Sequence, residues 1–106
     1  MNSPTFDSSG DPTEETLAAI ENWVPDFNDR SGPWTALMDY VKKTWNTDYG
    51  AIYEEQDEDG KPLICFVTGG WSANEGTQGA MDRHLLFRAM NWHSSYRGGL
   101  TKYALR

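Results

Sequence analysis

The chain has 106 residues, enough for one domain with a single hydrophobic core. It carries 16 acidic and 9 basic residues, which gives a formal net charge of −7. Aromatic residues make up 13% of the sequence, a content that disordered chains lack. The single cysteine, Cys65, excludes an intrachain disulfide and a zinc site built from several cysteines.

Two further features bear on the setting of the protein. The N-terminal sequence has neither the basic region nor the apolar region of a signal peptide. The longest strongly apolar run, residues 63–67, is far shorter than a membrane span. We therefore expect a cytoplasmic protein with a flexible tail at residues 1–10 and one domain over residues 11–106.

Charge is distributed unevenly along the chain. Residues 1–40 contain eight acids and one base, and residues 41–60 contain six acids and two bases. Residues 61–106 contain two acids and six bases. The acidic and basic parts either pair with each other in the fold or form separate surfaces for different partners.

Two helices are expected first in the chain. Asp11 is the expected N-cap of the first helix, with Pro12 at its first position, and Pro25 ends it. Its apolar stripe is Leu17, Ile20 and Val24. The second helix opens at Pro33, and its apolar residues recur with helical period: Trp34, Leu37, Met38, Val41 and Trp45.

A β-hairpin follows the helices. Its strands are expected at residues 49–54 and 63–68, with a turn built on Asp59 and Gly60. The second strand lacks polar alternation, which favours a central position in the sheet. The hairpin is the best-supported β feature of the sequence.

The C-terminal part predicts one long helix and a last strand. Ser72 and Glu75 form a capping-box pattern, which indicates a helix of about twenty residues. Residues 97–99 end the helical pattern, and residues 100–105 predict a strand. The sequence does not determine which strand it pairs with. The predicted order is α-α-β-β-α-β, an α+β fold with a small three-stranded sheet.

Two segments partly match ligand-binding motifs. The glycine pair after Thr68 lies between a strand and a helix, as in phosphate-binding turns, but no lysine follows and Glu75 would repel an anion. Residues 55–60 match the first half of an EF-hand loop, but Phe66 stands where the final glutamate belongs. We interpret the first as a tight turn and the second as a solvated hairpin tip.

The sequence offers no catalytic constellation. His84 and His93 are nine residues apart, which places them on roughly opposite faces of one helix, and neither has the neighbours of a zinc ligand. Cys65 in a buried strand is a poor nucleophile. We expect no catalytic residues, no metal and no cofactor.

The remaining candidate is a group of aromatic and basic residues. Arginine beside aromatic side chains is typical of protein interfaces and of surfaces that stack nucleic-acid bases. The alternative interpretation is that the two tryptophans close the core. The group consists of Trp71, Arg88, Trp92, Tyr96, Arg97 and Lys102.

The same part of the chain carries a recognisable pattern. Residues 67–72 read VTGGWS, residues 74–75 read NE, and Trp92, Ser94-Ser95 and Arg97-Gly98-Gly99 follow. This pattern resembles that of small uncharacterised proteins of actinobacterial phages, over less than half of the chain. Leu100 departs from it, since histidine is frequent there. The resemblance implies a phage or prophage protein in a bacterial cytoplasm and no known activity.

We therefore expect a non-catalytic accessory protein that binds and modulates a host or phage protein. Its sharpest form is an acidic inhibitor that mimics DNA. The alternative is a nucleic-acid-binding protein that uses Arg83, Arg88, Arg97 and Lys102, although the net charge opposes it. The oligomeric state is left open, and no membrane partner is expected.

Overall fold

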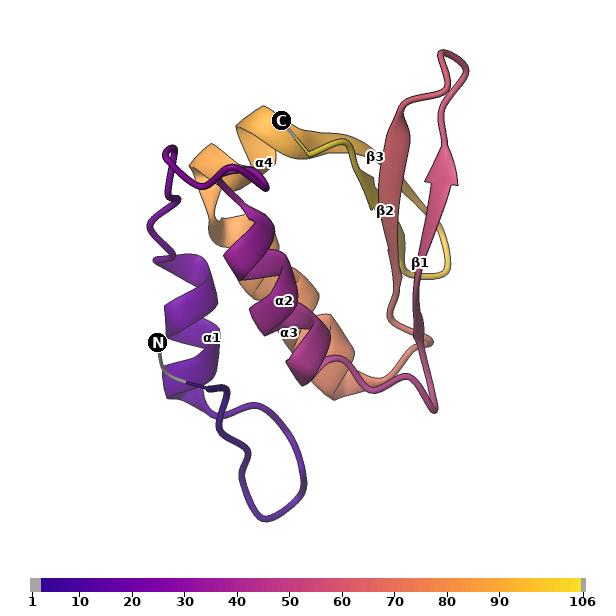
Figure 1. Cartoon of the computed structure of the whole chain (residues 1–106). Helices are drawn as coiled ribbons and strands as arrows, with labels where there is room; N and C mark the ends of the chain where they lie inside the picture. The colour runs from indigo at the N-terminus through magenta and orange to yellow at the C-terminus, as the bar shows by residue number, and fades with distance from the viewer. Residues whose placement is uncertain (1–2, 106) are drawn as a thin grey trace.

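The computed structural model describes residues 3–105, which form four helices and a four-stranded antiparallel sheet (Figure 1). The α+β class is therefore confirmed. The helices are α1 (Glu14–Glu21), α2 (Thr35–Thr44), α3 (Ser72–Arg83) and α4 (Leu85–Asn91). The strands are β1 (Ala51–Gln56), β2 (Pro62–Val67), β3 (Trp92–Tyr96) and β4 (Leu100–Tyr103), in the order β1-β2-β4-β3.

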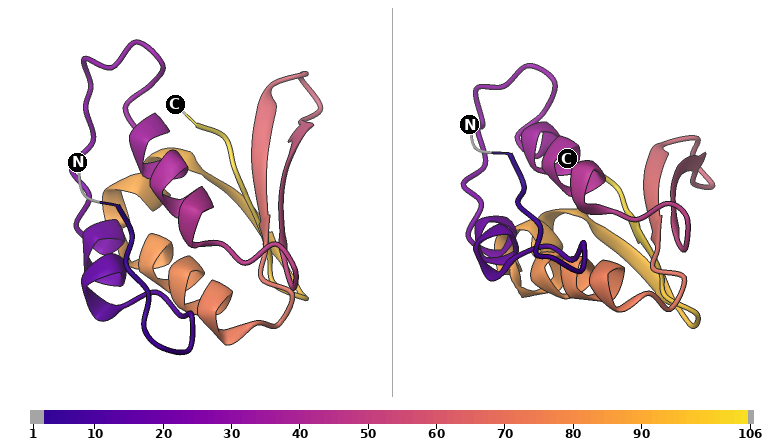
Figure 2. Two further views of the ribbon diagram at one scale, coloured as in Figure 1. Left: turned by 60° about the horizontal axis from the view of Figure 1, so that its bottom comes forward. Right: turned by 90° about the horizontal axis from the view of Figure 1, so that it is seen from below.

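All four helices lie on one side of the sheet (Figures 1 and 2). Within residues 3–105, no helix covers the opposite side, which we call the outer face. Of the helices in this described part of the chain, none is both long enough and apolar enough to cross a membrane. The helices therefore bury one side of the sheet, and the outer face is turned toward solvent.

Helix α2 supplies much of the core, as its apolar period predicts. It begins after Trp34, which is the N-cap. Its five predicted apolar positions are all buried: Trp34, Leu37, Met38, Val41 and Trp45. They join a cluster with residues from α1, the sheet and α4, including Ile20, Ile64, Phe66, Phe87 and Tyr103.

Helix α1 is shorter than predicted at both ends. Its N-cap is Thr13, whose hydroxyl accepts a hydrogen bond from the backbone N–H of Thr16, so Asp11 and Pro12 lie before the helix. The helix ends at Glu21, and Val24, placed by the sequence in the apolar stripe, is 83% exposed. Val24 is solvent-facing because the chain leaves the helix before reaching it.

The segment before α1 is tied to that helix. The backbone N–H of Thr5 donates to the Thr16 hydroxyl over 2.8 Å, and Phe6 pairs with Pro12 in an isolated antiparallel bridge. The flexible tail expected at residues 1–10 lies partly outside the described residues, since residues 1 and 2 are not described. From Thr5 onward these contacts hold the segment against α1.

The single long helix predicted after residue 72 is wrong. The helix is interrupted at His84, whose backbone is extended at φ −80° and ψ 92°. The His84 ring explains the break: Nδ1 accepts from the backbone N–H of Phe87, and Nε2 lies 2.6 Å from the carbonyl of Trp23. Because a carbonyl only accepts, Nε2 carries the proton. His84 thus ends α3, caps α4 and binds the segment that follows α1.

The predicted three-stranded sheet is also wrong, because residues 92–96 form a strand in place of a helix end. The turn at residues 97–99 joins this strand, β3, to β4. The hairpin of β1 and β2 and the central position of β2 are confirmed. The open question of the last strand is answered: β4 pairs with both β2 and β3.

Candidate functional site

Five of the six predicted site residues fall into three contact groups, and Arg97 belongs to none of them. Trp71, before α3, stacks on Tyr49 with ring centroids 4.5 Å apart. Arg88 and Trp92 meet at α4 and the start of β3, where the guanidinium carbon lies 5.0 Å from the centre of the indole ring. Tyr96 and Lys102 meet on the outer face, with the ammonium 5.2 Å from the ring centre. Arg97 is exposed in the β3–β4 turn.

The two glycine motifs of the C-terminal pattern meet each other. The backbone N–H of Thr68 donates to the carbonyl of Gly99 over 3.1 Å. A Cβ on Gly99 would lie 2.1 Å from the Thr68 hydroxyl, and a Cβ on Gly69 would lie 1.5 Å from the Tyr49 carbonyl. Both glycines have positive φ, so they serve close backbone packing. The tight-turn interpretation accounts for these contacts.

Asn74 explains another part of the pattern. Its side chain is fully buried, accepts from the backbone N–H of Asn46, and donates to the carbonyls of Asn46 and Thr68. The capping box predicted at Ser72 is wrong, because Trp71 is the N-cap of α3 and makes no side-chain capping bond. The chain enters α3 through a backbone turn in which the N–H of Trp71 donates to the carbonyl of Thr68.

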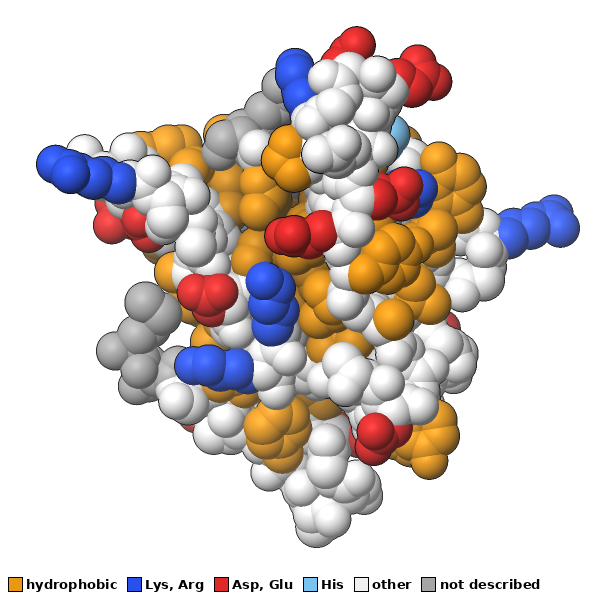
Figure 3. Space-filling model, turned by 45° about the vertical axis from the view of Figure 1, so that its right-hand side comes forward, with side chains coloured by type: hydrophobic (Ala, Val, Ile, Leu, Met, Phe, Trp, Pro, Cys, Tyr) orange, Lys and Arg blue, Asp and Glu red, His pale blue; other side chains and the backbone are white. Residues whose placement is uncertain are grey.

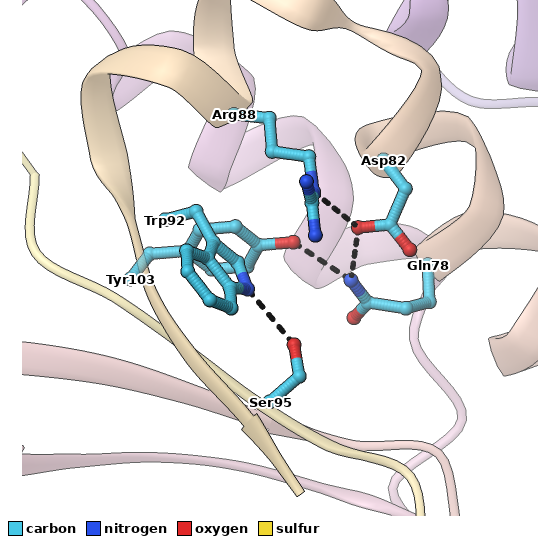
Figure 4. Close-up of polar contacts among 6 residues, drawn as sticks. All are labelled: Gln78, Asp82, Arg88, Trp92, Ser95 and Tyr103. Atoms are coloured by element: carbon cyan, nitrogen blue, oxygen red, sulfur yellow. Dashed lines mark hydrogen bonds and ion pairs between the residues drawn. The ribbon is translucent and has the colours of Figure 1, made fainter.

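The Arg88 and Trp92 group is part of a polar network between α3, α4 and the sheet (Figure 4). Gln78 donates to the Tyr103 hydroxyl over 2.7 Å and to Asp82 over 3.2 Å. Arg88 Nε lies 3.9 Å from Asp82, and Trp92 donates to Ser95. Burial, followed by the Asp82 charge, raises the pKa of Tyr103, which keeps its hydroxyl neutral. This network holds α4 on the sheet.

The outer face carries an ion pair that spans three strands. Lys102 on β4 and Cys65 on β2 are direct cross-strand partners, and Glu55 lies on β1. The Lys102 ammonium is 2.6 Å from Glu55 Oε1, and the Cys65 thiol donates to the same oxygen over 3.3 Å. The hydrogen bond with Lys102 lowers the pKa of Glu55 and raises that of Lys102. The pair therefore stays charged near neutral pH.

Cys65 lies beneath this pair. Its side chain is buried, and burial, followed by its bond to Glu55, raises the pKa of the Cys65 thiol to about 11. A thiol with such a pKa is protonated near neutral pH and unreactive. Cys65 therefore acts as packing beneath the ion pair, as its position in a buried strand predicts.

Two tyrosines flank the ion pair on the outer face. Tyr53 is 41% exposed and stands opposite Cys65, and Tyr96 is 52% exposed and lies beside Lys102. By strand alternation Val67 and Leu100, both partly exposed, lie on the same face. Figure 3 views the side of the molecule that carries the sheet, where hydrophobic side chains gather below acidic side chains at the top.

A recess separates the ion pair from the β1–β2 hairpin tip. Asp57 Oδ1 accepts from the backbone N–H groups of Asp59 and Lys61, so it shapes the turn as a hairpin tip, in agreement with the sequence interpretation. The recess is lined by the hairpin and two residues of the neighbouring strands: Glu55, Gln56, Asp57, Glu58, Asp59, Leu63, His93 and Lys102. The acidic tip thus borders the outer face.

Contrary to the sequence prediction, the two histidines do not lie on opposite faces of one helix, because the chain leaves the helix before His93 and enters β3. His84 is buried and committed to the bonds that cap α4, whereas His93 is exposed on β3, with Nδ1 2.8 Å from the Ser94 hydroxyl. Within residues 3–105, no three His, Cys, Asp or Glu side chains are grouped so that they could hold a metal ion.

The acidic and basic parts of the chain meet in the fold. Arg83 lies 3.3 Å from Glu21, and Lys102 lies 2.6 Å from Glu55. Among the described residues, Arg97 has no such carboxylate partner. Of the four cations named for nucleic-acid binding, Arg83, Arg88 and Lys102 are therefore each within 4.0 Å of a carboxylate of the chain itself.

Comparison of the chain with family models, with curated proteins and with solved structures found no match. Sequence reasoning named Tyr96, Arg97 and Lys102 but missed Tyr53 and Glu55. The spacing of Tyr53 and Glu55 by two residues in a strand was a signal, because it places both on one face.

Proposed function

We propose that the chain is a non-catalytic accessory protein of phage or prophage origin that binds and modulates another protein through the outer face of its sheet. The observation that carries this proposal is the position of Tyr53 and Tyr96, which stand exposed on a face that no helix among residues 3–105 covers. Tyrosine is enriched at the energetic centres of protein interfaces, since its ring is large and its hydroxyl tolerates water.

Three properties of the face suit protein binding. The strands are a rigid support, so little conformational entropy is lost when a partner docks. The Glu55–Lys102 pair is preformed and leaves no uncompensated charge at the centre. Partly exposed Val67 and Leu100 offer apolar area beside the tyrosines. The net charge of −7 favours encounter with a partner of opposite net charge, which is the setting of an acidic inhibitor in a bacterial cytoplasm.

The nucleic-acid alternative draws less support from the same contacts. Arg83, Arg88 and Lys102 each lie within 4.0 Å of a carboxylate, and only Arg97 of the four proposed cations does not. Binding to phosphates releases counterions only when cations are available to replace them. Among residues 3–105, only Arg97 of these four cations is free of a nearby carboxylate and available to bind phosphate.

The test is capture of partners from an actinobacterial lysate on the immobilised wild-type chain and on the double variant Tyr53→Ser/Tyr96→Ser. We expect one stoichiometric protein with the wild type and at least about tenfold less with the variant, since central interface residues contribute 2 kcal/mol or more. The matched control is Val24→Ser/Phe27→Ser, which removes two exposed apolar side chains from the loop after α1.

Two outcomes would overturn the proposal: recovery of no stoichiometric protein, or equal recovery with the tyrosine variant and the wild type. Nuclease treatment of the lysate separates the alternative. A signal that disappears with nuclease and falls steeply with salt would favour nucleic acid over a protein partner. Circular dichroism of each variant establishes that the fold is retained.

A further inference from the structure

The turns at the two ends of the outer face carry opposite charges. Strand β1 ends in the turn that carries Asp57, Glu58 and Asp59, and β3 ends in the turn that carries Arg97. Because β1 runs antiparallel to β2, β2 to β4 and β4 to β3, these two turns lie at opposite ends of the strands. Figure 1 shows the β1–β2 tip at the top and the β3–β4 turn well below it.

The charges at the two ends are available to a partner. Glu58, Asp59 and Arg97 are exposed, and none of them forms an ion pair with another residue of the described chain. The tip has three acids against the single base Lys61. Between the two ends lie the compensated Glu55–Lys102 pair and the apolar and aromatic side chains.

A surface with this arrangement is complementary to itself. A two-fold axis parallel to the sheet and perpendicular to the line from the tip to Arg97 exchanges the two ends. It places the acidic tip of one copy against Arg97 of the other, twice, with the tyrosines of both copies between. Two-fold interfaces of this kind, in which the same patch meets itself, are the commonest in homo-oligomers.

We propose that in the free protein the outer face is occupied by a second copy of this chain, in a two-fold dimer held by the hairpin tip and Arg97. A partner that is cationic throughout would meet repulsion at Arg97, and an anionic one would meet it at the tip. A surface with both signs at this spacing matches both turns, and the chain itself carries one.

The net charge of −7 on each copy opposes the approach of two copies over long distances. At an ionic strength of about 0.15 M this repulsion is screened beyond about 8 Å, whereas ion pairs inside an interface are closer than that. The dimer does not depend on the proposed function. If the proposed function holds, however, the partner face is buried between the two copies, and a partner has to displace the second copy. Partner binding would then depend on the concentration of the protein.

The test uses sedimentation equilibrium of the purified full chain at concentrations up to about 1 mM, a range that reaches weak association. We expect a dimer for the wild type. The variant Arg97→Glu and the variant Glu58→Arg/Asp59→Arg should each weaken the dimer at least about tenfold, because each places like charges at both contacts. Arg30→Glu, in the exposed loop before α2, is the charge-matched control for Arg97→Glu and should dimerise as the wild type does.

Mixing the two variants gives the decisive measurement. In a mixed dimer, Glu at 97 faces the basic tip and the native Arg97 faces the native acidic tip, so both contacts are attractive again. Two variants that each dimerise weakly alone should therefore form a tighter dimer when mixed in equal amounts. A monomeric wild type, reversals without effect, or a mixture that dimerises no better than either variant alone would each overturn the proposal.

The two proposals fail in different measurements. If the tyrosine variant loses capture and the wild type is monomeric, the dimer proposal is rejected and the proposal of a partner-binding face is supported. A dimer that obeys the charge reversals, in a chain that captures no protein, would remove the partner and leave the self-association. Each measurement is made on the intact chain.

Discussion

The Lys102 ammonium reaches across strand β2 to within 2.6 Å of Glu55, and the buried thiol of Cys65 lies beneath the contact. Through this contact the last strand of the sheet is joined to the first, although the two strands are not neighbours. The same pair joins the acidic and the basic parts of the sequence.

This pair should make the free energy of unfolding depend on pH at both ends of the scale. The folded-state pKa of Glu55 is lowered, so its contribution is present above the unfolded value of 4.5 and is lost as pH falls through the folded pKa. The pKa of Lys102 is raised, so its contribution is present below the unfolded value of 10.5 and is lost as pH rises through the folded pKa.

A double-mutant cycle with Glu55→Gln and Lys102→Met measures the coupling from chemical denaturation. We expect a favourable coupling at about pH 7 that is lost as pH falls through the folded-state pKa of Glu55, because the carboxylate is then protonated. The more exposed pair of Glu21 and Arg83 is the reference and should show a smaller coupling. A coupling of Glu55 and Lys102 that does not fall on acidification would contradict this account.

Substitution of the last two glycines separates backbone strain from steric overlap. Gly98 and Gly99 have nearly equal φ, 87° and 83°, but only at Gly99 does a Cβ meet another atom, the Thr68 hydroxyl. Gly98→Ala should cost about 1–2 kcal/mol, the usual penalty of a left-handed alanine. Gly99→Ala should cost clearly more, and the excess should shrink in a Thr68→Ala background. Denaturant unfolding of Gly98→Ala, Gly99→Ala, Thr68→Ala and the double variant Thr68→Ala/Gly99→Ala decides this, and equal costs at both glycines would contradict the close contact.

The break at His84 should be sensitive to loss of the imidazole. His84→Leu removes two hydrogen bonds and leaves the buried N–H of Phe87 and the carbonyl of Trp23 without their partner, which should cost about 2–4 kcal/mol of unfolding free energy. The control is His93→Leu, at an exposed site, with an expected effect within about 0.5 kcal/mol. Thermal and denaturant unfolding measure both. Similar stabilities for the two variants would show that the ring does not hold the junction.

The thiol of Cys65 should react slowly until the solution is strongly alkaline. Its raised pKa of about 11 means that the thiolate forms well above the usual value of 9.0. The unfolded chain then loses this proton first, so stability falls as pH rises above the unfolded pKa. Alkylation followed by mass spectrometry across the alkaline range checks the reactivity, with the denatured chain as reference. Removing the ion pair with Lys102→Met should not turn Cys65 into a fast-reacting thiol, because burial is the main cause of the shift.

The sequence predicts the local parts of this fold well. The period of α2 and the apolar run of β2 identify elements that are amphipathic or buried by themselves, and the Asp-Gly turn joins β1 to β2. The break at His84 was not predictable in this way. It depends on a bond to the carbonyl of Trp23, which is distant in sequence, while the flanking residues keep a helical pattern.

The sequence predicted only part of the candidate site. Tyr96 and Lys102 were recognised as an aromatic and basic pair, but Trp71 belongs to a separate contact with Tyr49. The spacing of Tyr53 and Glu55 indicates that both lie on one face of β1, but it does not place them near Lys102. They join the site because β4 pairs with β2, and a pairing between strands distant in sequence leaves no local signal. Strand β3 was not predicted for a related reason, since its polar sequence forms a strand only by pairing with β4.

The sheet order β1-β2-β4-β3 also has a consequence for how the chain folds. Each hairpin closes through a short turn, so each can form early from residues that are close in the chain. The pairing of β2 with β4 brings together segments that are separated by α3 and α4, and it carries the larger cost of loop closure. We therefore expect two independently nucleated ribbons that join late, with α3 and α4 already in place to align them.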